Sequence, residues 1–404
     1  MSHQSKKNTT ANAAHQRARR LLPGTLLICL SVTACMAQAD VKVFSDDKGD
    51  SISLFGIIDN GILVQSRSVK SNGSEGGTQT SSATSGLRQS VWGIKGGTGD
   101  LGIGDNTKAF FNLESHFDTT TGQLHGTGDA NQSNAILFRR QANLGLNGDW
   151  GTLILGRQYG PALLAHLDTE PRYFKENFSN LYAWAYGQIN GGVINPSGGN
   201  ARSSNNDVGI FFSNAIQYRN NFGPVTVGAL YSFGGQPGNF NNNSAWSLGA
   251  EYKGPVIVSA SYDEMKDALT GEVVVEHGGL GFAVPYGDFT FKTLLLNAKN
   301  RDSLGNTMAD VNADGIGMDW HWRPNNTATV AYYSNRNKTT SGDTTHNLVI
   351  SNDWAINSWV TFYSTLTLVD AGAQAGLLTS IVAGANYPVN AKTTFLNVGL
   401  NLAF

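Results

Sequence analysis

The chain has 404 residues, of which 40% are hydrophobic and only 14% are charged, and its formal net charge is −2. Soluble domains usually carry about 25% charged residues, and no basic stripe marks this chain as a nucleic-acid-binding protein. After residue 39 no apolar run reaches the ~18 residues that a membrane helix needs, which argues against helical membrane spans.

The first 39 residues differ from the rest. They contain five basic residues and no acidic one, followed by the apolar run LLPGTLLICLSVTACMA and then by AQA. This order predicts a secretory signal peptide over 1–39 and a mature domain over 40–404. Its removal leaves 23 of the 28 Lys and Arg against 30 Asp and Glu, a formal charge of −7, and removes both cysteines. The alternatives are a lipoprotein signal, VTAC, ending at Cys35, and a buried N-terminal helix.

From residue 51 onward, apolar residues alternate with small or polar ones in stretches of about ten residues. The first stretch is SISLFGIIDNGILV at 51–64, and the last is TTFLNVGLNLAF at 393–404. A period of two predicts β-strands with one apolar face. The fourteen stretches between them form seven predicted hairpins, at 90–96 and 107–117, 142–146 and 151–159, 214–219 and 225–233, 247–252 and 256–264, 273–284 and 289–298, 316–322 and 327–334, and 346–354 and 359–369.

Sixteen such strands, joined by short turns and long loops in alternation, predict an all-β fold, a 16-stranded antiparallel transmembrane β-barrel. Closure of the last strand on the first would remove the open edges that lipid does not tolerate. Alternation alone also fits a soluble sandwich, whose apolar face is a core and whose polar face is the exterior. Aromatic residues at strand ends, such as Trp246, Tyr252 and Trp320, favour the barrel because they match a membrane–water girdle.

Several segments carry a family resemblance: SISLFGIIDNG at 51–61, RQANLGLNGDWGTLILGRQY at 140–159, SLGAEYKGP at 247–255, and the terminal Phe404. In them the chain resembles the Gram-negative general porins, most closely the β-proteobacterial (neisserial and burkholderial) type, over about residues 50–404. The resemblance implies that Phe404 is an assembly signal. It also implies a homotrimer in the outer membrane, with outer-membrane lipids, lipopolysaccharide and small hydrophilic solutes as partners and no nucleic acid.

In this family the third loop folds inward and constricts the channel, and here that loop would span 159–213. The resemblance implies that charges of the loop face arginines of the wall. The expected constriction residues are Asp168, Glu170 and Glu176 of the loop and Arg139, Arg140 and Arg157 of the wall. Each of these charges fits a strand-end or loop position facing bulk water equally well, and the loop itself fits a floppy external connection as an alternative.

Two arginines that the family places on the wall are replaced here, by Val91 and Phe211. The resemblance therefore implies an incomplete anion-selective cluster. Together with the formal charge of −7, this predicts weak ion selectivity or a preference for less anionic solutes, because fixed charges set ion preference in such pores.

Two motifs are weighed and set aside. GTGDLG at Gly97–Gly102 has the spacing of a phosphate loop, but the alternation after it predicts a hairpin turn. DVNADG at Asp310–Gly315 supplies the first ligands of a calcium loop, yet His321 stands where a bidentate Glu is required. A polar hairpin loop is the favoured interpretation, with a calcium site in the sixth loop as the alternative.

The sequence predicts passive transport. H-E-x-x-H, G-x-S-x-G and C-x-x-C are absent from the mature chain, and nothing predicts an enzyme, a cofactor or a metal. A sixteen-stranded barrel leaves a water-filled channel, through which small hydrophilic solutes and ions would diffuse. The alternatives are a substrate-selective channel for small organic acids, including aromatic ones, and an exported soluble β-sheet adhesin or lectin.

Overall fold

The computed structural model describes residues 40–124, 136–180, 206–207, 209–375 and 388–404. The predicted signal peptide and both cysteines lie outside these residues. Within the described residues, no helix is long and apolar enough to cross a membrane.

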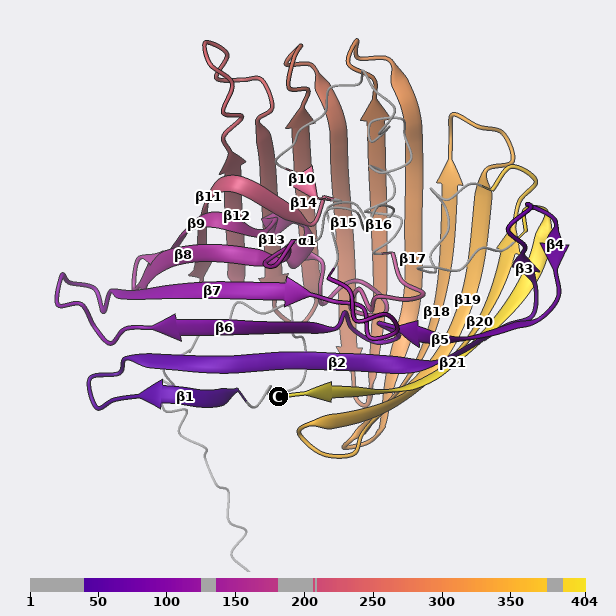
Figure 1. Cartoon of the computed structure of the whole chain (residues 1–404), viewed down its shortest axis with the longest axis horizontal. Helices are drawn as coiled ribbons and strands as arrows, with labels where there is room; N and C mark the ends of the chain where they lie inside the picture. The colour runs from indigo at the N-terminus through magenta and orange to yellow at the C-terminus, as the bar shows by residue number, and fades with distance from the viewer. Residues whose placement is uncertain (1–39, 125–135, 181–205, 208, 376–387) are drawn as a thin grey trace, which may run out of the picture. The chain divides into compact units, whose positions relative to one another are not determined.

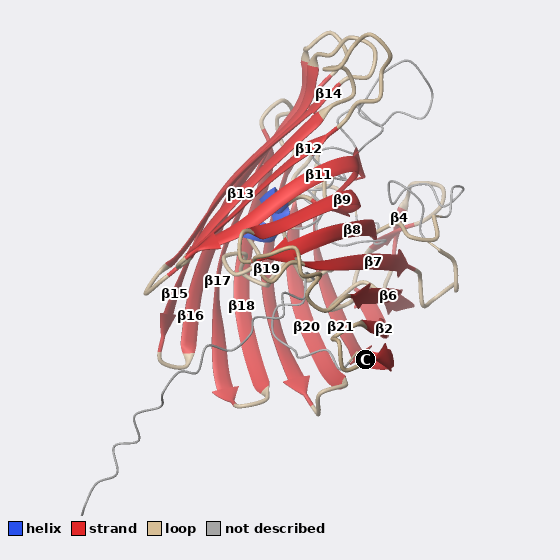
Figure 2. Ribbon diagram, turned by 90° about the vertical axis from the view of Figure 1, so that its left-hand side faces the viewer, coloured by secondary structure: helices blue, strands red, loops and turns tan. Residues whose placement is uncertain are grey.

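Sixteen long antiparallel strands of the described chain pair in sequence order and close on themselves (Figures 1 and 2). The last, β21 (Ala391–Ala403), pairs with the first, β2 (Ser51–Gln65), as the sequence predicts. The others are β6 (Val91–Gly97), β7 (Lys108–His116), β8 (Gln141–Gly148), β9 (Gly151–Tyr159), β11 (Phe211–Phe222), β12 (Val225–Ser232), β13 (Ala245–Lys253), β14 (Ile257–Lys266), β15 (Val273–Tyr286), β16 (Phe289–Arg301), β17 (Thr307–Arg323), β18 (Asn326–Asn337), β19 (Thr344–Ala355) and β20 (Val360–Ala371).

Shorter elements attach to this barrel. The strands β1 (Val41–Ser45) and β5 (Gln79–Thr84) pair with opposite ends of β2, and β10 (Asn206–Asp207) pairs with β11. The strands β3 (Ser68–Val69) and β4 (Glu75–Gly76) form a separate two-stranded sheet, and α1 (Pro161–Ala165) follows β9.

The two faces of the barrel strands differ in exposure. Leu144 and Leu155 are paired across β8 and β9 and are 60% and 45% exposed, whereas Gln141 and Asn143 on the other face are buried. The same pattern runs around the barrel, with exposed Leu, Ile and Val on one face and buried polar residues on the other. A soluble sandwich has the reverse arrangement, so this distribution is that of a membrane barrel.

The aromatic residues expected at a membrane–water girdle lie on the exposed face. Trp246, Tyr252, Trp320, Trp322 and Trp359 are each between 39% and 45% exposed. The terminal Phe404 closes the barrel at the turn end, where its backbone N–H and C=O both bond to Gly56. Its ring stacks on Trp359 at a centroid distance of 6.1 Å.

The prediction of a polar hairpin loop at Asp310–Gly315 is wrong. These residues lie inside β17 and pair on both sides, with β16 and β18. The strands here run on past the apolar belt toward the loop end, so Asp310 and Asn312 contact the amide of Asn297 on the neighbouring strand. The other motif behaves as predicted, since residues 98–107 form the turn between β6 and β7.

Candidate functional site

The connection between β9 and β11 packs against the wall as soon as it leaves β9. Its first element is α1, where Pro161 stands in the first helical turn and its missing N–H is tolerated. All five residues of α1 are buried, and the helix packs against β12, β13 and β14. We call residues 160–180 of this connection the β9–β11 loop.

A series of glycines in the strands leaves room for the β9–β11 loop. A Cβ added to Gly249 would lie 2.0 Å from the carbonyl oxygen of Pro161, and one added to Gly281 would lie 2.1 Å from Oγ1 of Thr169. Both distances are impossible for real atoms. The same conflict would arise at three further glycines, Gly228, Gly279 and Gly317, which face Pro161, His166 and Pro171. The loop therefore packs against a row of strand glycines, which we call the glycine track. The absence of side chains at these positions leaves room for the loop.

His166 fixes the loop to β14. Its Nδ1 lies 2.7 Å from Oγ of Ser259, and its Nε2 lies 2.7 Å from Oγ of Ser261. Burial lowers the pKa of His166 from its ordinary value of 6.5 to about 3, so the imidazole is neutral at physiological pH. Two residues further on, Asp168 forms an ion pair of 2.5 Å with Lys253 at the end of β13.

Several hydrogen bonds within the β9–β11 loop converge on the carboxylate of Glu170. The side chain is fully buried, and its carboxylate accepts hydrogen bonds from the backbone N–H groups of Arg172 at 2.6 Å, Phe174 at 2.8 Å and Asn180 at 3.2 Å. The hydroxyl of Tyr333 in β18 donates a fourth, of 2.8 Å. One carboxylate thus holds both the turn of the loop and its attachment to the wall.

Two lysines, one in the loop and one in β16, form ion pairs with carboxylates of the wall. The ammonium of Lys175 pairs with the carboxylate of Asp353 in β19. The ammonium of Lys292 in β16 is 2.7 Å from Oδ2 of Asp319 in β17, an ion pair that lacks hydrogen-bond geometry. The same ammonium is 3.0 Å from the ring centroid of Tyr173. Each lysine is therefore neutralised by a carboxylate of the wall.

Near its C-terminal end, the β9–β11 loop contacts the connection between β5 and β6. The carboxylate of Glu176 accepts a hydrogen bond of 2.7 Å from Gln89, and its backbone N–H donates to the carbonyl of Leu87. That connection is fixed in turn by Asp59 of β2, whose carboxylate accepts from the backbone N–H groups of residues 86–88. The loop therefore runs along the wall from β12 to the neighbourhood of β2.

Arg140 lies beside this meeting point. Its Nε donates to Oε1 of Glu114 at 2.5 Å, and its other nitrogens contact Gln89 and the hydroxyl of Tyr159. Burial by itself lowers the pKa of Arg140, but Tyr159 and Glu114 outweigh that effect and raise it, so the guanidinium stays charged. The ring of Phe211 lies 5.5 Å from this guanidinium and 5.7 Å from that of Arg157.

The other two arginines of the expected set are held by the wall. Arg157 donates a hydrogen bond of 2.7 Å to Oγ of Ser213 and another to the carbonyl of Arg139. Arg139 is only 1% exposed, and its Nη1 lies 3.2 Å from Nδ1 of His116. Arg140 and Arg157 thus flank Phe211, whereas the Arg139 side chain is buried against the wall.

The six expected residues have different surroundings in the structure. Glu170 and Glu176 are buried in hydrogen bonds, and Asp168 is paired and partly exposed. Sequence reasoning did not single out Lys175, Lys292, Asp353 or Lys253 as partners. A signal was available for Lys292 and Asp319, because each alternates with exposed aromatic residues in its strand.

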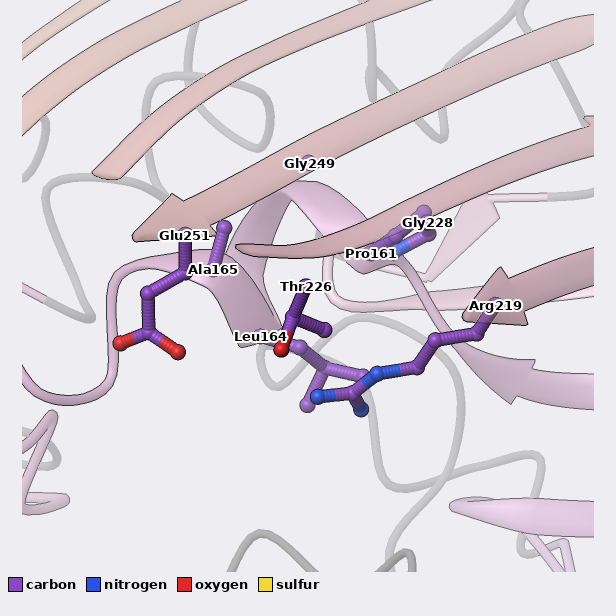
Figure 3. Close-up of a pocket in the computed structure, with 8 residues that line it drawn as sticks. All are labelled: Pro161, Leu164, Ala165, Arg219, Thr226, Gly228, Gly249 and Glu251. Carbon is purple, nitrogen blue, oxygen red and sulfur yellow. The ribbon is translucent and has the colours of Figure 1, made fainter. Parts of the chain in front are cut away.

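A pocket lies beneath α1, between the helix and the turn ends of β11, β12 and β13 (Figure 3). Its apolar wall is formed by Pro161, Leu164 and Ala165, and its charged residues are Arg219 and Glu251. Among the described residues no group of three or more His, Cys, Asp or Glu side chains could hold a metal ion.

Comparisons with known proteins agree with this architecture. A family model described as Gram-negative porin matches residues 25–374, and a comparison with curated proteins returns no match. The chain is similar to the anion-selective porin from Comamonas acidovorans, with 22% identity over 88% of this chain and 100% of that one and a TM-score of 0.69.

Two further solved structures are similar at lower identity. Salmonella typhi OmpF, in complex with daunomycin, shares 15% identity over 90% of this chain and 100% of that one, with a TM-score of 0.57. The in-vitro folded OmpT of Vibrio cholerae, described as a trimer form, shares 12% identity over 88% of this chain and 99% of that one, with a TM-score of 0.56.

Proposed function

Because the chain belongs to the Gram-negative porin family, we propose that its β9–β11 loop forms the constriction of the channel. The protein is an outer-membrane channel for the passive diffusion of small hydrophilic solutes. A barrel of sixteen strands encloses a water-filled lumen unless a loop narrows it. The observation that carries the proposal is the track of glycines facing residues 161–171, because it lies on the strand face opposite to the exposed apolar belt.

The proposed constriction is formed by Asp168, Glu170 and Glu176 from the loop and by Arg139, Arg140 and Arg157 from the wall. Charges in this region largely compensate one another in pairs: Arg140 with Glu114, Lys175 with Asp353, Lys253 with Asp168 and Lys292 with Asp319. Paired charges produce a weak net field along a pore, whereas rings of one sign produce ion preference. We therefore propose a general diffusion channel with weak ion selectivity.

The test is the zero-current potential of the reconstituted channel in a tenfold KCl gradient. We expect a value near zero and a conductance that rises in proportion to salt concentration. A potential close to the limit for a pure anion or cation channel would contradict charge compensation. Failure to conduct at all, or failure to let sugars swell loaded liposomes, would contradict the constriction and channel together.

A channel specialised for aromatic acids is less well supported. Of the aromatic residues expected in the loop, Phe174 and Phe178 are buried, and Phe178 packs against Phe395 of the wall at a centroid distance of 5.7 Å. Tyr173 covers Lys292. These rings attach the loop rather than line a solute path. Tyr182, Trp184 and Tyr186 lie outside the described residues.

We also propose that residues 1–39 are removed on export and that the mature chain, 40–404, assembles as a homotrimer in contact with outer-membrane lipid and lipopolysaccharide. The trimer form of Vibrio cholerae OmpT supports the assembly. N-terminal sequencing of the purified protein tests the cleavage site. The apparent mass of unheated protein in a detergent gel, compared with boiled protein, tests the trimer.

A further inference from the structure

The connection between β5 and β6 runs along the inner face of the barrel at residues 85–90, which we call the 85–90 segment. Three buried side chains of the wall surround it: Asp59 of β2, Tyr363 of β20 and Asn401 of β21. In their strands they alternate with residues such as Ile58 and Leu400, which are 45% and 51% exposed on the apolar belt. Successive side chains of a strand point to opposite faces, so the segment lies inside the barrel.

The carboxylate of Asp59 holds the backbone of the segment. It accepts hydrogen bonds from three consecutive N–H groups, those of residues 86–88, at 2.8, 3.2 and 3.1 Å. The hydroxyl of Tyr363 and the side-chain amide of Asn401 each donate one more, of 2.9 Å. Consecutive N–H groups that converge on one anion form a nest. Ser85 enters this nest with a φ of 62°, which is uncommon for a residue other than glycine.

Glycines leave room for the segment, as they do for the β9–β11 loop. A Cβ added to Gly86 would lie 2.2 Å from the hydroxyl oxygen of Tyr363. Additions to Gly61 of β2 and Gly399 of β21 would lie 2.8 and 2.3 Å from the same oxygen. The wall is therefore shaped to place this hydroxyl beside the segment.

The 85–90 segment is also joined to the β9–β11 loop. The side-chain amide of Gln89 donates to Glu176 at 2.7 Å, and the carbonyl of Leu87 accepts from the Glu176 backbone at 3.3 Å. The amide oxygen of Gln89 accepts from the guanidinium of Arg140. The segment thus links β2 to the C-terminal end of the loop and to one of the wall arginines.

Arg88 places a positive charge at this junction. The side chain is partly exposed, and its Nη2 donates a hydrogen bond of 3.1 Å to Oδ1 of Asn401. Arg88 forms no ion pair with any residue that the structure describes, although Asp59 and Asp353 interact with it electrostatically at longer range. The lysines of the loop and wall are instead paired with carboxylates in direct contact, as Lys175 is with Asp353. The charge of Arg88 is therefore less compensated than theirs.

We propose that the 85–90 segment is a second element of the constriction, that Asp59 positions it, and that Arg88 adjusts the ion preference of the channel. Solutes then pass between two chain segments that are hydrogen-bonded to each other, rather than between one loop and the wall. The proposal rests on the proposed constriction by the β9–β11 loop, because the contacts of Gln89 and Leu87 join the two elements.

Thiol modification of single channels in planar bilayers tests the position of Arg88. The described chain contains no cysteine, so Arg88→Cys presents one thiol to methanethiosulfonate reagents that carry either trimethylammonium or sulfonate. We expect both reagents to lower the conductance in a step, because both add bulk to the constriction. The trimethylammonium reagent should return the ratio of K⁺ to Cl⁻ permeability toward the wild-type value, whereas the sulfonate reagent should raise it further.

Arg88→Gln provides a measurement that needs no modification. It should raise the ratio of K⁺ to Cl⁻ permeability by about twofold, the effect of one unit charge acting through water over about one Debye length. As a control, Glu272→Cys places a thiol on the exposed loop between β14 and β15. Its modification should change neither conductance nor permeability ratio.

Asp168→Cys separates this proposal from the one on which it rests. Modification there should lower the conductance if the β9–β11 loop lines the constriction. A response at Asp168→Cys, with none at Arg88→Cys and no shift in Arg88→Gln, overturns the second element and leaves the proposed constriction in place. No response at either position refutes both elements, and a protein that never conducts refutes the channel itself.

The positioning role of Asp59 is tested by Asp59→Asn, which keeps the size of the side chain but adds N–H groups among the donors. Release of the segment should raise open-channel noise and abolish the effect of Arg88→Gln in the double variant, and Asp59→Glu should restore part of both. If Asp59 acted by its charge alone, Asp59→Asn would lower the ratio of K⁺ to Cl⁻ permeability, leave the noise unchanged and preserve the effect of Arg88→Gln. That result would overturn the positioning role.

Discussion

Replacing Glu170 with alanine should release the β9–β11 loop while leaving the barrel closed. The carboxylate accepts four described hydrogen bonds, three from the loop's own backbone and one from Tyr333. None of the sixteen strands depends on it, because every strand-to-strand pairing is made by backbone groups elsewhere. The loss should therefore appear as a change in the channel rather than as failure to fold.

The magnitude follows from these four bonds. Hydrogen bonds to a charged group contribute about 1.5–3 kcal/mol each, so the free energy of docking the loop falls by at most about 6–12 kcal/mol. In a water-filled channel the freed donors bind water instead, which reduces the loss. We therefore expect each lost hydrogen bond to lower the free energy of docking by about 0.5–1.5 kcal/mol, or about 2–6 kcal/mol for the four together. Even 2 kcal/mol raises the undocked population by about 30-fold. Tyr333→Phe removes one bond and should have a smaller effect.

Single-channel recording measures the outcome. We expect larger and noisier open-channel currents in Glu170→Ala, an intermediate effect in Tyr333→Phe, and no change in Glu272→Ala, where the same side chain is removed from the loop between β14 and β15. The heat-dependent shift in gel migration should persist in all three variants. Currents of Glu170→Ala that match the wild type in amplitude and noise would show that this carboxylate does not hold the constriction.

Three further predictions concern other contacts of the structure. Gly281→Val places side-chain atoms where Thr169 lies, so it should displace the loop and raise open-channel noise, and wild-type currents would refute the glycine track. Acidification should loosen the loop at His166, whose folded pKa of about 3 is below its ordinary 6.5: the neutral ring stabilises docking above pH 6.5, and this contribution falls as pH drops toward 3. His166→Gln should flatten that pH dependence of conductance, and an unchanged profile would refute the assignment. Gly56→Val should slow assembly, because a Cβ there lies 2.6 Å from the ring of Phe404, and normal yields of heat-modifiable protein would contradict the prediction.

The barrel could be predicted from the sequence because its signal is local and repeated. Residues such as Leu144 and Leu155 alternate with Asn143 and Gly156, and each stretch reports its own period without reference to the rest of the chain. The count of strands and the closure of β21 on β2 followed from that pattern. The pattern failed at Asp310–Gly315, where the strand extends beyond the apolar belt and one of its faces carries Asp310, Asn312 and Asp314 in place of apolar residues.

The positions of the loop charges could not be predicted in this way. A loop has no periodic pattern, so the sequence predicts the same exposure for Glu170 and Asp168. In the structure Glu170 is fully buried, whereas Asp168 is partly exposed. The partner of Glu170 is Tyr333, which is 163 residues away. The glycines of the wall were the overlooked signal: Gly249 and Gly281 interrupt strands whose pattern otherwise calls for a side chain at each position.

Compensated charge also gives a physical reason for an aromatic residue at position 211 of the wall. Phe211 lies between the guanidinium groups of Arg140 and Arg157, so a third guanidinium there would add repulsion without adding a carboxylate to balance it. An aromatic ring instead offers its negative face to both cations. The substitution thus preserves the positions of two arginines while lowering the positive charge of the wall. Such a wall fits the weak ion selectivity that we propose for this channel.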